Sequence, residues 1–285
     1  MKHTHKHIFV ATPIVIAILL IAFVGAYAPA LSVATAEEEL HYGAILSSST
    51  STETVSYASY TEETYHDNTN FPSYYNTDSA LTNVCAPVAG ADVIGYFDRN
   101  YTNLIPSWNP GYTSGSNYQY YPQLTPFVTY IQGVISALYT QMGTNTTGDG
   151  TTRAQYQAGL TSYVQNAGYS ISFSNSMSGT IPNVSTIKTQ LQAGKVVSLY
   201  LNGYTYTTPT LTSTAATYSH TTYTGTHVAI AYGYRIIRYY NASGVNFRTD
   251  TLLKVATGQA SSKYAYVLVS SSLTTFVAAD VTNVY

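Results

Sequence analysis

Charged residues are scarce in this sequence: only 8 % of its 285 residues are Asp, Glu, Lys or Arg, whereas soluble domains usually contain about 25 %. The formal net charge is −2, which excludes a generally basic nucleic-acid-binding protein. The chain has a single cysteine, which excludes a disulfide scaffold, an iron–sulfur cluster and a cysteine-rich zinc site. We therefore expect no cofactor, no metal ion and no nucleic-acid partner.

Apolar residues, by contrast, are plentiful. They make up 45 % of the chain, and 30 residues are tyrosine. This composition excludes a disordered protein, which needs low hydrophobicity and high net charge. With so few charges, hydroxyl and amide groups must make the surface polar. The length allows one large domain or two small ones, at roughly 100–200 residues per domain.

The N-terminal segment contains an apolar run without charge from Ile8 to Ala26. Small residues at Ala34-Thr35-Ala36 resemble a cleavage site, so residues 1–36 are predicted to be a secretory signal peptide. Because the run is nearly long enough to span a bilayer, an uncleaved membrane anchor is the alternative. In both cases the rest of the chain is extracellular or at the cell surface. Four N-x-[ST] sequons agree with an exported glycoprotein: Asn100, Asn145, Asn183 and Asn241.

Residues 37–75 form an acidic stretch rich in serine and threonine. It holds all six glutamates of the chain together with Asp67, and no lysine or arginine, whereas the remainder is mildly basic. One interpretation is a solvated linker. The other is a pro-segment or docking strand that charge helps to hold on the body of the protein.

Residues 76–285 are predicted to form one domain in which helices come first and strands follow. Apolar residues at helical spacing, with Pro near two of the starts, indicate helices, and runs of β-branched and aromatic residues indicate strands. The helices are expected over 84–100, 125–143, 153–166 and 185–192, and the strands over 196–201, 227–236, 251–256, 264–269 and 276–285. The absence of βαβ alternation predicts an α+β fold.

The candidate chemistry lies in Cys85 and His227. Cys85 stands at the start of the first predicted helix of the domain, where unpaired N–H groups and the helix dipole favour a thiolate. His227 lies at the mouth of a buried strand far along the chain, where an imidazole could accept the thiol proton. His220, in a loop rich in Thr, Tyr and Ser, is the less favoured base and is expected to be exposed.

The segment Cys-Ala-Pro-Val-Ala-Gly-Ala-Asp-Val-Ile-Gly-Tyr-Phe-Asp-Arg at 85–99 resembles the nucleophile helix of papain-like cysteine peptidases, and within them the bacteriocin-processing-peptidase-like branch. Thr-His-Val-Ala-Ile-Ala-Tyr-Gly-Tyr at 226–234 resembles the histidine strand of that family. The resemblance covers residues 81–285. It implies a papain-like fold, with the Cys helix in a helical N-terminal half and the His in an antiparallel C-terminal half. It also implies that Cys85 is the nucleophile and His227 the general base and acid.

Two positions depart from the pattern of this family. Ser79 stands where such peptidases commonly carry the glutamine that stabilises the oxyanion; Asn83 has the nearest side-chain amide, and with Cys85 it is the predicted oxyanion donor. The segment Leu252–Gly258 also lacks the Asn or Asp that would orient the histidine.

A hairpin that turns at Ala242-Ser243 would bring His227 opposite Gly258. The neighbours of Gly258 are then the candidates to hold the ring: Gln259 as an amide, and Thr257 more weakly. Asp280 is the alternative carboxylate, if the last strand passes beneath. The residues do not decide between Gln259 and Asp280.

These observations predict an exported cysteine peptidase or amidase that cleaves peptide or protein substrates through a thioester. The alternative is a papain-like protein that has lost the reaction and binds or supports structures at the cell surface. A glycan-binding module is a third hypothesis and rests only on the tyrosine clusters (Tyr118, Tyr120, Tyr121, Tyr204 and Tyr206). The sequence gives no indication of the oligomeric state.

Overall fold

The computed structural model describes residues 39–43, 45–66, 71–106, 127–269 and 272–285. All of its helices and strands belong to the compact unit Leu40–Tyr285. The predicted signal peptide or anchor at 1–36 lies outside the described residues. Within the described ranges, no helix is both long and apolar enough to cross a membrane.

The unit has an α+β fold, as the sequence predicts, with four described helices and a large antiparallel sheet. The helices are α2 (Cys85–Asp98), α3 (Phe127–Gln141), α4 (Arg153–Asn166) and α5 (Val184–Gln192). The strands are β1 (Ile45–Ser56), β2 (Ser59–Tyr65), β3 (Ile171–Asn175), β4 (Met177–Ser178), β5 (Ile181–Pro182), β6 (Val196–Leu211), β7 (Ala215–Tyr240), β8 (Asn246–Ala256), β9 (Tyr264–Leu268) and β10 (Phe276–Val284).

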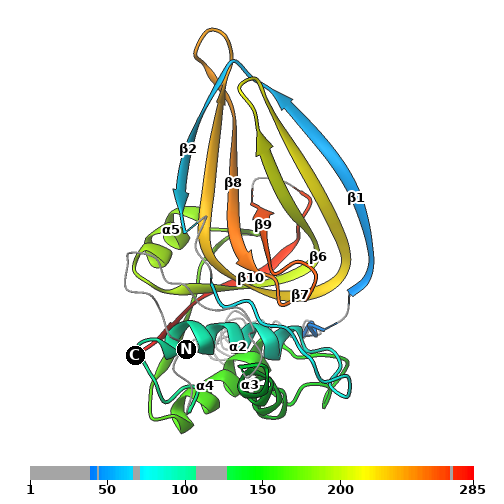
Figure 1. Cartoon of the computed structure of the whole chain (residues 1–285), viewed down its shortest axis with the longest axis vertical. Coiled ribbons are helices and arrows are strands. Elements are labelled where there is room, and N and C mark those ends of the chain that lie inside the picture. Colours follow the sequence, from blue (N-terminus) through cyan, green and yellow to red (C-terminus); the bar gives the residue numbers. More distant parts are fainter. Residues whose placement is uncertain (1–38, 44, 67–70, 107–126, 270–271) are drawn as a thin grey trace, which may run out of the picture. The chain divides into compact units, whose positions relative to one another are not determined.

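Strand β7 organises the sheet because it folds back on itself (Figure 1). Its first residue, Ala215, pairs with Ser56, and its last, Tyr240, pairs with Ser59. Since only two residues separate Ser56 from Ser59, the two ends of β7 must lie close together. The strand therefore descends towards the helices, bends, and returns. Strands β6, β7, β8 and β9 pair in a closed ring.

The bend leaves part of one edge of β7 without a strand partner. Along one edge, β6 pairs with β7 from Ala216 to Ala231. Along the other edge, β1 pairs as far as Gly225 and β8 begins only at Ile230. Among the described strands, none pairs with that edge over residues 226–229, which we call the edge gap. His227 lies in this gap.

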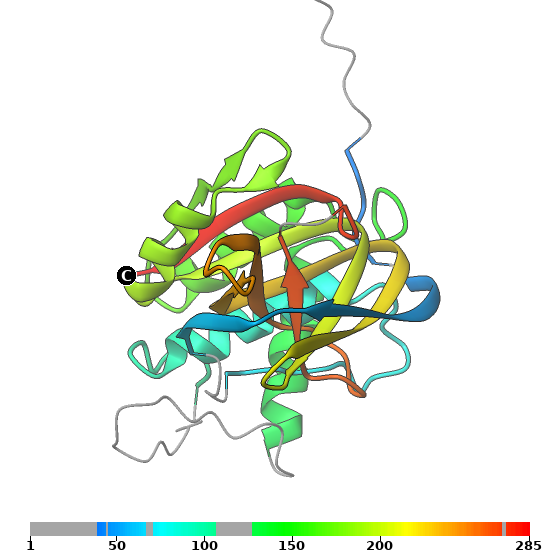
Figure 2. The same ribbon diagram turned by 90° about the horizontal axis from the view of Figure 1, so that it is seen from above.

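Helix α2 packs against the sheet at the level of the bend. The main core joins apolar residues of the helical layer, such as Val88 and Ile94, to Val228, Ile230 and Tyr200 of the sheet. Figure 2 shows β1 and β2 (blue) along one side of the sheet and β10 (red) along the opposite side. Helix α2 thus meets β7 next to the edge gap.

The structure places residues 45–65 in the sheet rather than in a linker. Strands β1 and β2 both pair with β7, and their glutamates form ion pairs with the mildly basic body. These pairs are Glu53 with Arg248, Glu62 with Arg235, and Glu63 with Lys188 and Arg238. The docking-strand interpretation of the acidic stretch agrees with this arrangement. The predicted boundary at residue 76 does not coincide with the compact unit, which begins at Leu40.

Candidate active site

The first turn of α2 has backbone N–H groups that bond neither within the helix nor to a capping side chain. Val84 occupies the N-cap position, and within the described residues no side chain caps the helix. In the first turn Pro87 has no N–H group, and the Val88 N–H donates to the Val84 carbonyl at 2.9 Å. The N–H groups of Cys85 and Ala86 are the two that remain at the helix terminus.

Three backbone N–H groups lie near the Cys85 sulfur and favour its charged form. Two belong to Cys85 itself and to Ala86, and the third is that of Val228 in the edge gap. Burial nevertheless raises the pKa of the Cys85 thiol to about 12, because desolvation outweighs the three donors. The resting sulfur is therefore a neutral thiol, with donors already in place for a negative charge.

His227 is buried in the edge gap, one residue before Val228. Its Nε2–H donates to the Thr257 carbonyl at 2.8 Å. A proton on Nε2 leaves Nδ1 as the basic nitrogen of the neutral ring. Burial lowers the pKa of His227 to about 4, although the bond to Thr257 acts in the opposite direction. At neutral pH the imidazole is therefore uncharged and able to accept a proton.

Two tyrosines contact the His227 ring, and a third packs on them. Tyr204 stacks on it with centroids 5.0 Å apart, Tyr206 meets it edge-on at 6.3 Å, and Tyr223 stacks on Tyr204 at 5.0 Å. From the sequence, Tyr204 and Tyr206 were predicted only as lining residues of a glycan-binding groove. Both side chains are buried, and their contacts assign them to packing around the histidine. Tyr118, Tyr120 and Tyr121 lie outside the described residues.

Neither predicted orienting side chain lies on the His227 ring. The Gln259 amide donates to the Tyr204 hydroxyl at 3.5 Å. Asp280 is fully buried on β10, where it accepts from Arg153 and Gln157. In place of both, the main-chain carbonyl of Thr257 holds the ring. A main-chain carbonyl cannot be recognised from the sequence because every residue has one. The hairpin register nevertheless predicts that Thr257 lies next to His227.

Asn83 also has a different partner from the one expected. Its backbone is left-handed, with φ of 55°, and its amide donates to the Asn145 side chain at 3.0 Å. Asn145 in turn accepts from Gly150 and donates to Tyr139, so its amide is engaged within the protein. Ser79 is exposed. The Asn83 side chain is thus engaged with Asn145, and the groups described near the sulfur are main-chain N–H groups.

His220 is not in an exposed loop, as the sequence suggested, but buried within β7. Its Nδ1 hydrogen-bonds with the Thr207 hydroxyl at 3.0 Å, and its Nε2 lies 3.7 Å from Glu53. These contacts lie on the arm of β7 that pairs with β1, towards the end of the sheet remote from the helices. His220 and Cys85 are thus placed in different parts of the unit.

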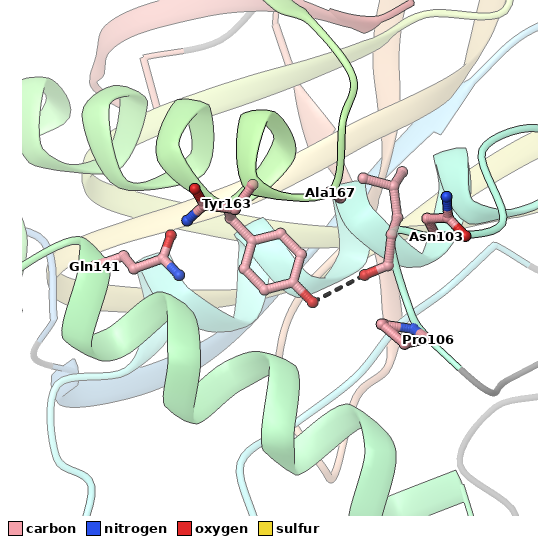
Figure 3. A pocket seen from close by; sticks show the side chains of 7 residues that line it. Asn103, Pro106, Gln141, Tyr163 and Ala167 are labelled. Carbon is pink, nitrogen blue, oxygen red and sulfur yellow. Dashed lines mark hydrogen bonds between the residues drawn. The ribbon is translucent and has the colours of Figure 1, made fainter.

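A cavity of about 420 Å³ lies elsewhere, near the C-terminal ends of α3 and α4 (Figure 3). It is lined by Asn103, Leu104, Pro106, Gln141, Tyr163, Asn166 and Ala167. The Tyr163 hydroxyl donates to the Leu104 carbonyl at 2.9 Å, and none of the lining side chains is an acid, a histidine or a cysteine. Across the described part of the chain, no group of three or more His, Cys, Asp or Glu residues could hold a metal ion.

Comparison of the chain with models of known protein families, with curated proteins and with solved structures gives no match. The functional argument therefore rests on the geometry of Cys85 and His227.

Proposed function

We propose that this chain is an exported cysteine-type peptidase or amidase of the papain-like class, with Cys85 as nucleophile and His227 as general base and acid. The observation that supports the proposal is that Cys85 lies next to the edge gap that contains His227. The Cys85 sulfur is near the N–H of Val228, and the Nε2 of the preceding residue, His227, is fixed by the Thr257 carbonyl. A nucleophile, a base and a group that orients the base are the three parts that thiol acyl transfer requires.

In the proposed reaction Nδ1 of His227 takes the thiol proton while the sulfur attacks the carbonyl carbon of a peptide bond. The backbone N–H groups of Cys85 and Ala86 at the start of α2 would stabilise the oxyanion that forms. His227 then gives the proton to the leaving amine. In the second step His227 takes a proton from water, the water attacks the thioester carbonyl, and the Cys85 thiol is released. Thr257 fixes the tautomer throughout, as a carboxylate or amide does in other sites of this chemistry.

The second candidate function is a binding protein of the same fold that does not react. It is favoured by a specific observation: the described contacts include no hydrogen bond between the Cys85 sulfur and the His227 ring. The raised pKa of the thiol and the lowered pKa of the imidazole also mean that the resting pair is neutral. A pair of this kind reacts only if substrate binding draws the two groups together.

The rate at which iodoacetamide alkylates Cys85, measured across pH, separates the two candidates. A peptidase predicts alkylation at neutral pH that falls roughly 10²-fold in His227→Gln, the usual scale for a positioned base. His220→Gln is the matched control and should label like the wild type. Slow alkylation that rises only at strongly alkaline pH, equally in all three proteins, would instead support the binding protein. Hydrolysis of a casein or peptide-library substrate, abolished by Cys85→Ala, completes the test.

A further inference from the structure

The hydrogen bond to Thr257 holds the His227 ring along one line only. The ring is attached to β7 through its Cβ, and its Nε2–H donates to the Thr257 carbonyl. A ring held at these two points can still tilt about the line that joins them. Such a tilt moves Nδ1, the nitrogen that would take the thiol proton, so groups packed on the face of the ring decide where Nδ1 lies.

Tyr204 packs on this face. The Tyr204 and His227 ring centroids are 5.0 Å apart with an interplanar angle of 19°, and the Tyr204 side chain is fully buried. Tyr223, the cross-strand partner of Tyr204 on β7, stacks on Tyr204 at 5.0 Å. Tyr204 is therefore itself held between strands while it covers the imidazole.

A β-bulge in β6 turns Tyr204 towards the histidine. Leu201 lies directly opposite His227, and opposite residues of an antiparallel pair project from the same side of the sheet. In a regular strand Tyr204, three residues after Leu201, would project from the other side. The register shifts between Asn202 and Tyr204, where Gly203 has φ of +67°. As a result Leu201 and Tyr204 belong to the same core cluster, which is how a bulge re-aims a side chain.

Gln259 holds the far end of the Tyr204 side chain. Its Nε2 donates to the Tyr204 hydroxyl at 3.5 Å. The hydroxyl oxygen is the atom of a tyrosine farthest from the backbone, so a bond there fixes where the ring stands. Burial holds the pKa of Tyr204 well above its ordinary value, so the phenol stays neutral and keeps this contact at every pH at which the protein is folded.

The turn at 257–259 thus supports both the edge and the face of the imidazole. The Gln259 N–H donates to the Thr257 hydroxyl at 3.1 Å, and the Thr257 carbonyl accepts from His227. Contacts therefore run in a closed circuit from His227 through Thr257, Gln259 and Tyr204 and back to His227. After burial, a negative charge on Cys85 is the next cause that raises the pKa of Tyr204, which places the phenol within electrostatic reach of the sulfur.

We propose that Gln259 and Tyr204 are positioning residues of the candidate site: the Gln259 amide fixes the Tyr204 ring, and this ring keeps Nδ1 of His227 directed for proton transfer. The proposal rests on the function proposed above and adds a second support for the base. It gives Gln259 a role through Tyr204, whereas the sequence predicts a direct contact with the imidazole.

The test measures the rate at which iodoacetamide alkylates Cys85, together with kcat and KM for casein. Gln259→Met and Tyr204→Phe each remove the hydrogen bond and keep most of the packing volume. Each should lower the alkylation rate and kcat about fivefold, the scale of one net hydrogen bond, with KM unchanged. The double variant should be no slower than either single variant, because all three proteins lack the same bond.

Gln192 and Tyr234 provide a matched control pair. The Gln192 amide donates to the Tyr234 hydroxyl at 2.9 Å, which is the same kind of bond outside the candidate site. Gln192→Met and Tyr234→Phe should leave the alkylation rate and kcat unchanged.

Tyr204→Leu gives a readout that a purely structural role would not move. Burial lowers the pKa of His227 to about 4, and Tyr204 is part of what buries the ring. Loss of the stack should therefore raise this pKa and move the acid limb of alkylation and hydrolysis to higher pH. In Tyr204→Phe, which keeps the stack, the acid limb should stay at its wild-type position. Urea midpoints ensure that folded proteins are compared.

Four outcomes would overturn the proposal. Wild-type rates in both Gln259→Met and Tyr204→Phe, with His227→Gln still impaired, would refute the positioning roles and leave the peptidase in place. A double variant slowed by the product of the single effects would mean that the two residues act separately. Equal slowing in the control pair would assign the loss to general destabilisation. Alkylation that does not depend on His227 even in the wild type would refute the proposed function as well.

Discussion

Replacement of Arg153 by methionine should destabilise the protein without impairing the site. The Asp280 side chain is 1 % exposed and accepts from Arg153 at 2.7 and 2.5 Å and from Gln157 at 2.7 Å. Arg153→Met would leave this buried carboxylate with the amide alone. Removing one partner of a buried pair costs about 3–5 kcal/mol. Because the Arg153 side chain is 39 % exposed and water can approach it, we expect the lower end, about 3 kcal/mol.

Urea unfolding followed by circular dichroism measures this cost. With a slope of about 3 kcal/mol per molar urea, the midpoint should fall by roughly 1 M. Arg238→Met is the control: its partner Glu63 and Arg238 itself are both more than a third exposed, and exposed pairs contribute only about 0–1 kcal/mol. Alkylation of Cys85 should be unchanged in folded Arg153→Met. A normal midpoint together with lost activity would refute this reasoning and return Asp280 to the role of orienting residue.

Three further predictions concern positioning and pH. Gly258→Ala should slow hydrolysis and alter its pH profile while the protein remains folded. Residue 258 has φ of +69°, and a Cβ there would lie 3.1 Å from Val88. The resulting shift of the backbone would displace the neighbouring Thr257 carbonyl from the His227 ring. Hydrolysis should persist to about pH 5 and fall below pH 4, since burial lowers the pKa of His227 to about 4 and protonation removes the base; a profile that falls near pH 6.5 would contradict this. Burial raises the pKa of Asp98 to about 7, so its contribution to stability is present at acidic pH and is lost as pH rises from about 4 through 7; Asp98→Asn should flatten that part of the stability curve.

The sequence predicts the helices well because their ends carry local signals. Helix α4 begins and ends where expected, since Thr152 and Gln155 form a reciprocal capping box and Gly168 follows the last turn in the left-handed region. Such signals depend on a few adjacent residues and need no knowledge of the tertiary structure.

The long strands are predicted only in part. Strand β7 was expected over 227–236 but runs from Ala215 to Tyr240, and β1 was foreseen only as the docking-strand alternative for residues 37–75, without bounds of its own. Both contain long stretches of Thr, Ser and Tyr, in which hydrophobic alternation is absent. Thr207 and His220, for example, are buried and bonded to each other. A buried polar pair has no hydrophobic period, so pattern analysis assigns it to a loop.

Only the pair Cys85 and His227 was selected from residue type and position in a way that the structure does not contradict. The structure places the Cys85 sulfur near the backbone of Val228, the residue after His227. The orienting group was expected to be a side chain. Bulges shift the β7–β8 register, and strand pairing ends at Ile230 and Ala256. Thr257 therefore meets the ring through its carbonyl, a group that every residue has and no sequence distinguishes.

The edge gap explains why a cysteine lies where it does, and this gives a final prediction. Polar groups of the edge gap have partners outside β6: the Thr226 hydroxyl bonds to the chain at 41–43, the His227 ring donates to the Thr257 carbonyl, and the backbone N–H of Val228 lies near the Cys85 sulfur. A buried backbone N–H needs such a partner. Cys85→Ala leaves that N–H unsatisfied, at a cost of about 1 kcal/mol because sulfur is a weak acceptor. Cys85→Ser, whose oxygen can replace the sulfur, should lose less stability in urea although both variants are inactive. An alanine variant as stable as the serine variant would mean that the sulfur does not stabilise the edge gap and is retained for its reactivity alone.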